Sequence, residues 1–235
     1  MKSAPPYHAE RGTAVHSVIE QCLLEDRDPR EFLGEWIQVE DEECLEFPIS
    51  FCMEEKEISA VELFMETIND YTGMPHQIYS EQFMQHSEFP ELQGTSDCLI
   101  LQGVNGLVVM DYKNGTVSVP ARKRDGSLNP QLMCYLELAC DWSGCDPDTA
   151  SLVVVQPNRK TKKKVVTTNV TRTEREAFYG EIQRTAEYLR DCVQGRTDGE
   201  LKDRLVEGSY CWYCPARKIC PVQLAASLAR DFNDE

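Results

Sequence analysis

A buried strand that ends in an acid and a lysine limits the folds open to this chain more than any other part of its sequence. Residues 106–112 form the largely apolar run Gly-Leu-Val-Val-Met-Asp-Tyr, and Lys113 follows it. Successive side chains of a strand alternate between its faces, so we expect Asp111 and Lys113 to point the same way and Tyr112 the other. Charged groups at the boundary of a core need partners or a metal ion. The alternative is a surface salt bridge at a strand end, which is the better interpretation of an isolated Asp-x-Lys.

Asp97 supplies a second carboxylate near the start of the preceding apolar run. It follows Gly-Thr-Ser at 94–96, which we expect to form a turn. Two carboxylates on adjacent strands can chelate Mg²⁺ or Mn²⁺, which prefer hard oxygen ligands. Such an ion polarises a phosphate and lowers the pKa of a bound water, and a lysine can orient that water or stabilise developing negative charge. Asp97, Asp111 and Lys113 therefore predict a metal-dependent site for a phosphate ester.

The composition limits the class of protein. The 235 residues fit one large domain, or one domain with a small appendage, and no long apolar stretch could span a membrane. The N-terminus lacks an apolar secretion signal, so we expect a cytoplasmic protein. The net charge of −16 argues against broad non-specific binding to nucleic acid. Basic residues concentrated at 122–124 and 159–164 could still serve a nucleic-acid enzyme, although each run could instead be a solvated loop or strand face.

Hydrophobic periodicity predicts an α/β fold with a mixed central β-sheet flanked by helices. The run at 151–156 is apolar on both faces, which is typical of a central strand. We expect helices at 9–25, 56–71, 130–139 and 172–194, strands at 76–84, 96–102, 106–112, 151–156 and 165–170, and a hairpin turn at 103–106.

Five further polar residues lie on these expected elements. His16 lies in the first helix, and Glu20 one turn later could orient its imidazole, although a lone helical histidine is more often structural. Gln131 and Tyr135 share one helix face and suit recognition of a phosphate or a base; the alternative is a helix start followed by a core tyrosine. Glu81, inside an expected strand, could add a carboxylate to the site or face solvent.

Cysteines near the C-terminus have metal-binding spacing. Of 11 cysteines, Cys211, Cys214 and Cys220 form the pattern Cys-x-x-Cys-x5-Cys beside two prolines. Thiolates at this spacing can bind one metal ion or the edge of a cluster, and the alternative is chance clustering. The cysteines in apolar segments are expected to be core residues: Cys22, Cys98, Cys134, Cys140 and Cys192.

Four short motifs, taken in order, resemble the RecB-type branch of the PD-(D/E)xK nuclease superfamily. They are Gly12-x-x-x-His16, Gly94-x-x-Asp97, Asp111-x-Lys113 and Gln131-x-x-x-Tyr135. The match covers about 12–157 and is similar in particular to phage-encoded exonucleases and to the related iron–sulfur exonuclease of CRISPR adaptation.

The resemblance implies a role for each matched residue. One or two Mg²⁺ or Mn²⁺ ions would be held by His16, Asp97, Asp111 and the Tyr112 main-chain carbonyl. The catalytic lysine would be Lys113. The DNA contact would come from Gln131 and Tyr135. We therefore expect a nuclease domain over 1–200 with a helical insertion at 28–72, and a cysteine-rich segment over 201–235 that packs on the core.

In these relatives the C-terminal cysteines hold a 4Fe–4S cluster whose fourth ligand precedes the histidine motif. This chain has no cysteine before Cys22, so Cys22, Cys44 or Cys52 could replace that ligand, or the site could hold zinc or nothing. The role of such a centre would be structural: it would fasten the C-terminal segment to the N-terminal helix and shape a DNA channel.

The function that the resemblance implies is a metal-dependent deoxyribonuclease, an exonuclease rather than an endonuclease. It would act on single-stranded DNA or duplex ends in phage recombination, replication or repair, in a bacterial host cytoplasm. A recombination partner such as a single-strand annealing protein, and a homo-oligomer, would fit that setting. Two alternatives stay open. One is an inactive nuclease-fold module that holds DNA or a partner with a cysteine-bound cofactor, against which Asp97 and Lys113 argue. The other is an acidic zinc-binding interaction protein.

Overall fold

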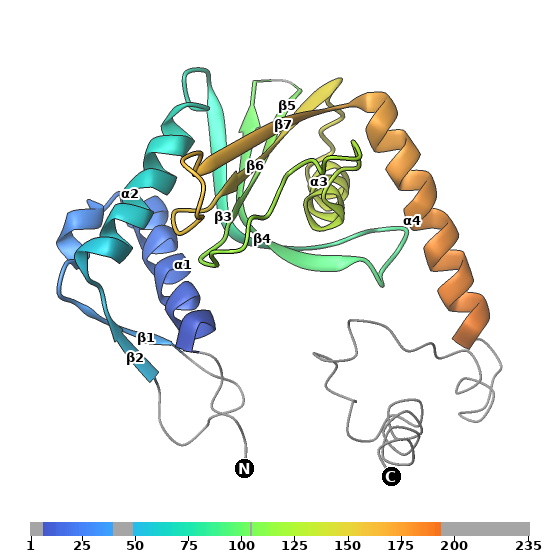
Figure 1. Ribbon diagram of the computed structural model, residues 1–235. Helices are drawn as coiled ribbons and strands as arrows, with labels where there is room; N and C mark the ends of the chain where they lie inside the picture. Colours follow the sequence, from blue (N-terminus) through green and yellow to red (C-terminus); the bar gives the residue numbers. More distant parts are fainter. Residues whose placement is uncertain (1–6, 40–48, 104, 194–235) are drawn as a thin grey trace, which may run out of the picture. The chain divides into compact units, whose positions relative to one another are not determined.

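The computed structural model describes residues 7–39, 49–103 and 105–193. Its helices and strands follow one another along the chain as Figure 1 shows. In order they are α1 (Tyr7–Glu25), the 3-10 helix η1 (Pro29–Phe32), β1 (Trp36–Val39), β2 (Ile49–Cys52), α2 (Glu55–Asn69), β3 (His76–Gln85), β4 (Gln93–Gln102), β5 (Gly106–Tyr112), α3 (Pro130–Ser143), β6 (Thr149–Val155), β7 (Val165–Thr171) and α4 (Arg172–Val193).

The chain divides into two compact units, Met1–Tyr179 and Gly180–Glu235. The described residues of the second unit are the C-terminal part of α4. The first unit contains every other described element. The predicted domain boundary at residue 200 and the packing of 201–235 stay predictions.

The first unit is built on a five-stranded mixed sheet with the strand order β3-β4-β5-β6-β7. β5 and β6 run parallel, and the other neighbours are antiparallel. Parallel neighbours need a crossover, which the segment containing α3 supplies. The two parallel strands are also the most apolar, because both of their faces are covered. The predicted mixed α/β fold is confirmed.

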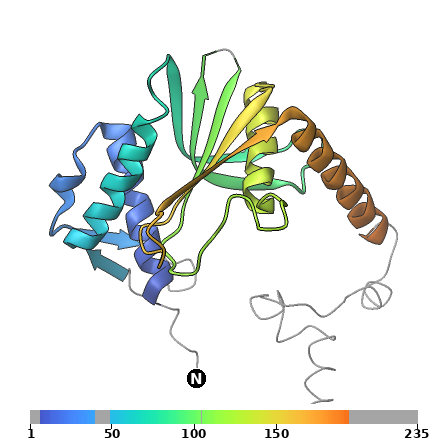
Figure 2. The ribbon, with the colours of Figure 1, turned by 45° about the horizontal axis from the view of Figure 1, so that its top comes forward.

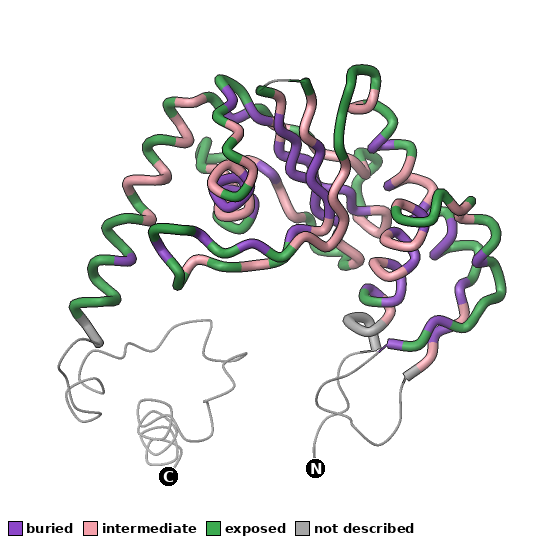
Figure 3. The backbone as a smooth tube through the Cα atoms, turned by 180° about the vertical axis from the view of Figure 1, so that it is seen from behind, coloured by how far each residue is buried: buried purple, intermediate pink, exposed green. Residues whose placement is uncertain are grey.

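Helices cover both faces of the sheet (Figures 1 and 2). Alternate strand residues such as Ile100 and Met110 pack with α1 and α2 in one core, while Leu99 and Val109 pack with α3 in the other. Buried residues concentrate along the central strands in Figure 3. Each face thus has its own apolar core, and polar groups can collect only where strands end or part.

The start and end of α3 follow directly from the sequence. Asn129 caps it by accepting a hydrogen bond from the Gln131 main-chain N–H at 3.0 Å, and Pro130 occupies the first turn, where a missing N–H costs nothing. Gly144 ends it with a φ of 69°, a conformation that favours glycine. This stop lies a turn beyond the predicted end at residue 139.

Two details differ from the sequence analysis. The expected helical insertion at 28–72 contains η1 and the antiparallel pair β1–β2 as well as α2. Gly94 to Ser96 do not form a turn: they belong to β4, where pairing with Met84 and Gln82 continues the ladder. In the part of the chain that the structure describes, no helix is both long and apolar enough to cross a membrane.

Candidate active site

Three acids lie in one row across the neighbouring strands β3, β4 and β5. In the ladder between β3 and β4, Ser80 pairs with Cys98 and Gln82 pairs with Ser96. Glu81 and Asp97 lie opposite each other between these pairs but are not themselves paired. The ladder between β4 and β5 stops at Cys98–Met110, so Asp97 and Asp111 come next, where the strands part. Like charges directly opposite on adjacent strands are destabilising. A row of three therefore needs a positive charge beside it.

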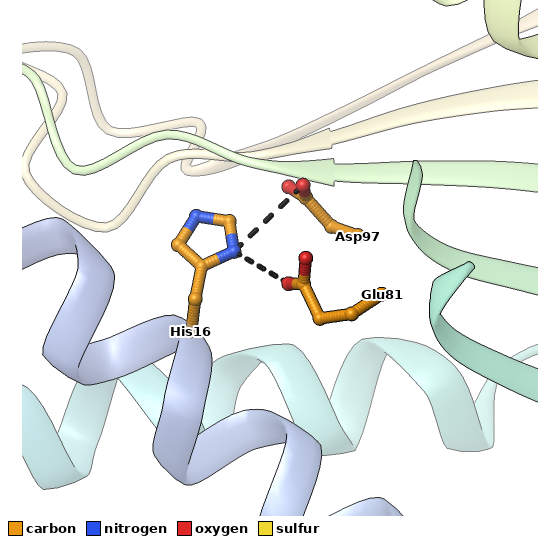
Figure 4. Close-up of side chains that lie close together, drawn as sticks. All are labelled: His16, Glu81 and Asp97. Atoms are coloured by element: carbon orange, nitrogen blue, oxygen red, sulfur yellow. Dashed lines mark hydrogen bonds and ion pairs between the residues drawn. The ribbon is translucent and has the colours of Figure 1, made fainter. Parts of the chain in front are cut away.

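His16 reaches this row from α1 (Figure 4). Its Nδ1 lies 3.1 Å from Glu81 Oε1 and 3.7 Å from Asp97 Oδ1. The imidazole stands edge-on to Tyr112, with ring centroids 5.1 Å apart. One potential ligand atom from each of His16, Glu81 and Asp97 falls within 4.8 Å of the others, a spacing suited to one metal ion.

The surroundings favour a charged imidazole. Burial alone would lower the pKa of His16, but the hydrogen bond with Glu81 and the charges of Asp97 and Asp111 raise it overall. In the absence of another cation, the imidazolium would partly neutralise the acids. A metal ion at the same place would compete with that proton.

Asp97 joins the two strands that part at this point. Its Oδ2 accepts a 2.7 Å hydrogen bond from the Tyr112 main-chain N–H, which has lost its partner in the ladder. Burial and the neighbouring charge of Asp111 raise the pKa of Asp97 to about 6, although the Tyr112 bond and His16 oppose the shift. The carboxylate is thus fixed in place and carries negative charge that its surroundings compensate poorly.

Asp111 and Lys113 point the same way, as strand alternation predicts. Lys113 Nζ donates a 2.8 Å hydrogen bond to Asp111 Oδ1. Asp111 is only 2% exposed, and its Oδ2 has no hydrogen-bond partner in the described residues. Burial raises the pKa of Asp111 despite the Lys113 charge, while the same contact raises the pKa of Lys113, which therefore stays protonated. One buried acid oxygen remains able to accept a cation.

Glu81 enters the site because β3 is kinked. Its φ of 46° lies in the left-handed region, which costs a non-glycine residue about 1–2 kcal/mol. Tyr79 and Met84 both pack on the α3-side core, although five positions would place them on opposite faces of a regular strand. The kink breaks the alternation between them. Strain of this kind is typical of functional sites.

Gln131 and Tyr135 lie close to the same acids. Gln131 Nε2 donates to the Tyr135 hydroxyl at 3.1 Å across one turn of α3. Burial, together with the charges of Asp97 and Asp111, raises the pKa of Tyr135. A Cβ added to Gly94 would lie 3.1 Å from Tyr135 Cε1, so the glycine in Gly-x-x-Asp makes room for this ring.

The structure groups the predicted residues somewhat differently from the sequence analysis. Glu81 takes a central place, while Asp111, bonded to Lys113, is not among the three residues of the 4.8 Å group. Glu20 makes no bond to the imidazole of His16 within the described residues, because that ring faces Glu81 and Asp97. The role of the Tyr112 main-chain carbonyl as a metal ligand stays a prediction.

The cysteine cluster of Cys211, Cys214 and Cys220 lies outside the described residues, and so does Cys44. Cys22 is 2% exposed in the α1-side core, and burial raises the pKa of its thiol to about 11. Cys22 is therefore a core residue, as its apolar segment predicts. Its role as a fourth ligand of a cysteine-bound centre stays a prediction, because Cys211, Cys214 and Cys220 lie outside the described residues.

Gln156, which was not predicted as a site residue, holds the loop after Lys113. It is 1% exposed; its Nε2 donates to the carbonyls of Gly115 and Val117, and its Oε1 accepts from the Val119 N–H. The available signal was a glutamine directly after the apolar run of β6. A buried amide in that position needs several partners, and a neighbouring loop can supply them.

Comparison with known proteins finds a family match for the chain as a whole. A family model described as the PD-(D/E)XK nuclease superfamily matches residues 2–221. No curated protein matches the chain. Among solved structures, a putative exonuclease from Eubacterium rectale has 13% identity and a TM-score of 0.44, with 93% of this chain and 76% of that chain covered. An alkaline exonuclease (LHK-Exo) from Laribacter hongkongensis has 18% identity and a TM-score of 0.31, with 55% and 70% covered.

Proposed function

The chain belongs to the PD-(D/E)XK nuclease superfamily, and we propose that it is a deoxyribonuclease that depends on Mg²⁺ or Mn²⁺. The observation that carries the proposal is the row formed by Glu81, Asp97 and Asp111, closed by His16 and Lys113. Three acids gathered at a partly buried point repel one another, and a bound cation would offset that repulsion.

The donor set fits a hard divalent ion. Carboxylate oxygens and one imidazole nitrogen are suitable ligands for Mg²⁺ or Mn²⁺. The unpartnered Asp111 Oδ2 and the spacing of His16, Glu81 and Asp97 support a metal site. When bound, an ion there supplies Lewis acidity toward a phosphate oxygen and makes a bound water more acidic. The main-chain carbonyl of Tyr112 is a further proposed ligand.

The remaining residues act on the substrate in this proposal. The Lys113 ammonium, held by Asp111, orients the attacking water or stabilises charge that develops on the scissile phosphate. Gln131 and Tyr135, bonded to each other beside the acids, guide the DNA strand. Exonuclease rather than endonuclease activity rests on the resemblance of the four motifs to phage-encoded exonucleases.

The wider setting is part of the same proposal. Phage recombination, replication or repair, a single-strand annealing partner, cytoplasmic location and a homo-oligomer follow from that resemblance alone. A 4Fe–4S cluster or zinc ion on Cys211, Cys214 and Cys220 is likewise proposed from the spacing of those cysteines.

The test compares the wild-type protein with Lys113→Ala on single- and double-stranded DNA labelled at one end, with Mn²⁺ or with EDTA. We expect labelled mononucleotides from the wild type in Mn²⁺ only, and a rate at least about a hundredfold lower in the variant. Lys123→Ala, which removes an exposed lysine of the same connecting segment, is the matched control. Equal rates for wild type and Lys113→Ala would reject the assignment.

A further inference from the structure

The turn between β6 and β7 gathers positive charge on an otherwise acidic chain. Five of its residues from 159 to 164 are lysine or arginine, while the net charge of the whole chain is −16. Lys160, Lys162 and Lys163 are exposed. A run of this kind can be a solvated surface, so its position relative to the proposed active site decides what it can do.

This turn emerges at the same edge of the sheet as the proposed catalytic lysine. β5 and β6 are parallel, so their C-terminal ends lie together, and Lys113 N donates to Val155 O at 2.9 Å directly after the ladder (Figure 1). Asn158 then donates from Nδ2 to both the main-chain and side-chain oxygens of Asn114, at 3.0 and 2.7 Å. The basic run begins at the next residue.

The turn also has a defined shape. Gln156 N donates to Lys164 O at 2.8 Å, and Arg159 N donates to Gln156 O at 3.2 Å. Lys164 Nζ bonds to the Arg159 carbonyl. Together with the three bonds from the Gln156 side chain to the loop after Lys113, these contacts connect the basic turn to that loop. These hydrogen bonds hold the main chain of the turn in one conformation, and the exposed lysine side chains project from it.

The other basic run, 122–124, contains an arginine whose charge is paired within the fold. The guanidinium of Arg122 donates to the carbonyls of Gly126 and Asn169, and it forms a 2.8 Å ion pair with Glu174. Its charge is therefore compensated inside the fold. Lys123 and Arg124 remain exposed farther along the segment that follows Lys113, and none of the described hydrogen bonds joins them to Asn114 or to Gln156.

We propose that the turn 157–164 binds the phosphate backbone of the DNA strand next to the scissile phosphate. This inference rests on the proposed nuclease function and names the surface that holds its substrate. The partner is a nucleic-acid backbone because exposed lysines at close spacing match a chain of phosphates and carry no base-specific geometry. The connection through Gln156 and Asn158 keeps those contacts in register with Lys113.

The test measures binding of fluorescently labelled DNA by anisotropy, with Ca²⁺ in place of Mn²⁺, between about 50 and 200 mM salt. Lys162→Gln/Lys163→Gln is compared with Lys123→Gln/Arg124→Gln, which also removes two charges. We expect the first variant to bind about tenfold more weakly and to reduce the slope of log affinity against log salt by about two. The control should stay within about twofold of wild type.

Cleavage in Mn²⁺ by the same proteins separates the two proposals. If wild type cleaves DNA and both variants bind equally well, the turn is not the binding surface, while the nuclease function stands. An equal loss of affinity in both variants also rejects the turn, because it would show a general effect of charge. If wild type binds through the turn but cleaves nothing with any divalent ion, the surface is supported and the nuclease function fails.

Discussion

Replacing Asp97 by asparagine or by alanine separates two roles of this carboxylate. Its Oδ2 accepts the Tyr112 main-chain N–H at 2.7 Å, and its Oδ1 faces His16. Alanine leaves that N–H without its acceptor, which costs about 1–3 kcal/mol. Asparagine keeps an oxygen acceptor and removes one of three neighbouring negative charges.

The two variants should therefore differ in stability and agree in activity. At about 2–4 °C per kcal/mol for a chain of this size, Asp97→Ala should melt about 2–12 °C below wild type in EDTA. Asp97→Asn should melt at or above the wild-type temperature, because repulsion from Glu81 and Asp111 is relieved. Both should cleave DNA at least about a hundredfold more slowly, since each lacks an anionic ligand.

The assay is thermal unfolding followed by circular dichroism, with EDTA and with Mn²⁺. At ten times its dissociation constant, Mn²⁺ should stabilise wild type by about 1.4 kcal/mol and leave Asp97→Asn nearly unchanged. Equal melting temperatures for the alanine and asparagine variants in EDTA would refute the role given to the Tyr112 bond. Full Mn²⁺-dependent cleavage by Asp97→Asn would refute the role as a ligand.

Substitutions at three other positions test separate parts of the structure. Glu81→Gly should be about 1 kcal/mol more stable to urea than Glu81→Ala, because only glycine adopts a φ of 46° without cost, and both should lose activity. Burial raises the pKa of Glu137 from 4.5 to about 7, although the Arg175 guanidinium lies 3.6 Å from its carboxylate. Between these two pH values the folded protein keeps a proton on Glu137 that the unfolded chain has lost. Its unfolding free energy should therefore fall as pH rises through this range, by at most about 3 kcal/mol, and urea titrations should show a smaller fall for Glu137→Gln. Gly94→Ala should push against the Tyr135 ring and lower the melting temperature, with a loss on the order of 1 kcal/mol and a raised KM for DNA.

The central sheet and the pair Asp111–Lys113 could be predicted because both depend on local patterns. An apolar run buried on both faces identifies a central strand, and alternation alone places the two charged groups on one side. The start of α3 at Pro130 is equally local, since an asparagine cap precedes it.

The place of Glu81 could not be predicted, because glutamate gives no sign of a left-handed φ. The regular alternation expected of β3 is broken at that residue, and only the fold shows that the side chain then faces His16. The turn predicted at 94–96 was wrong because a glycine often marks a turn. Here Gly94 lies in β4 and leaves room for the ring of Tyr135. The pair β1–β2 was missed because two four-residue strands carry too little periodicity.

The most direct test of the metal site is a Mn²⁺ titration followed by electron paramagnetic resonance, which measures free Mn²⁺. Wild type should bind one or two ions, and Asp97→Asn, with its fold preserved, should bind at least about tenfold more weakly. Equal Mn²⁺ binding by the two proteins, or no binding by wild type, would contradict the proposal that Glu81, Asp97 and His16 form a metal site.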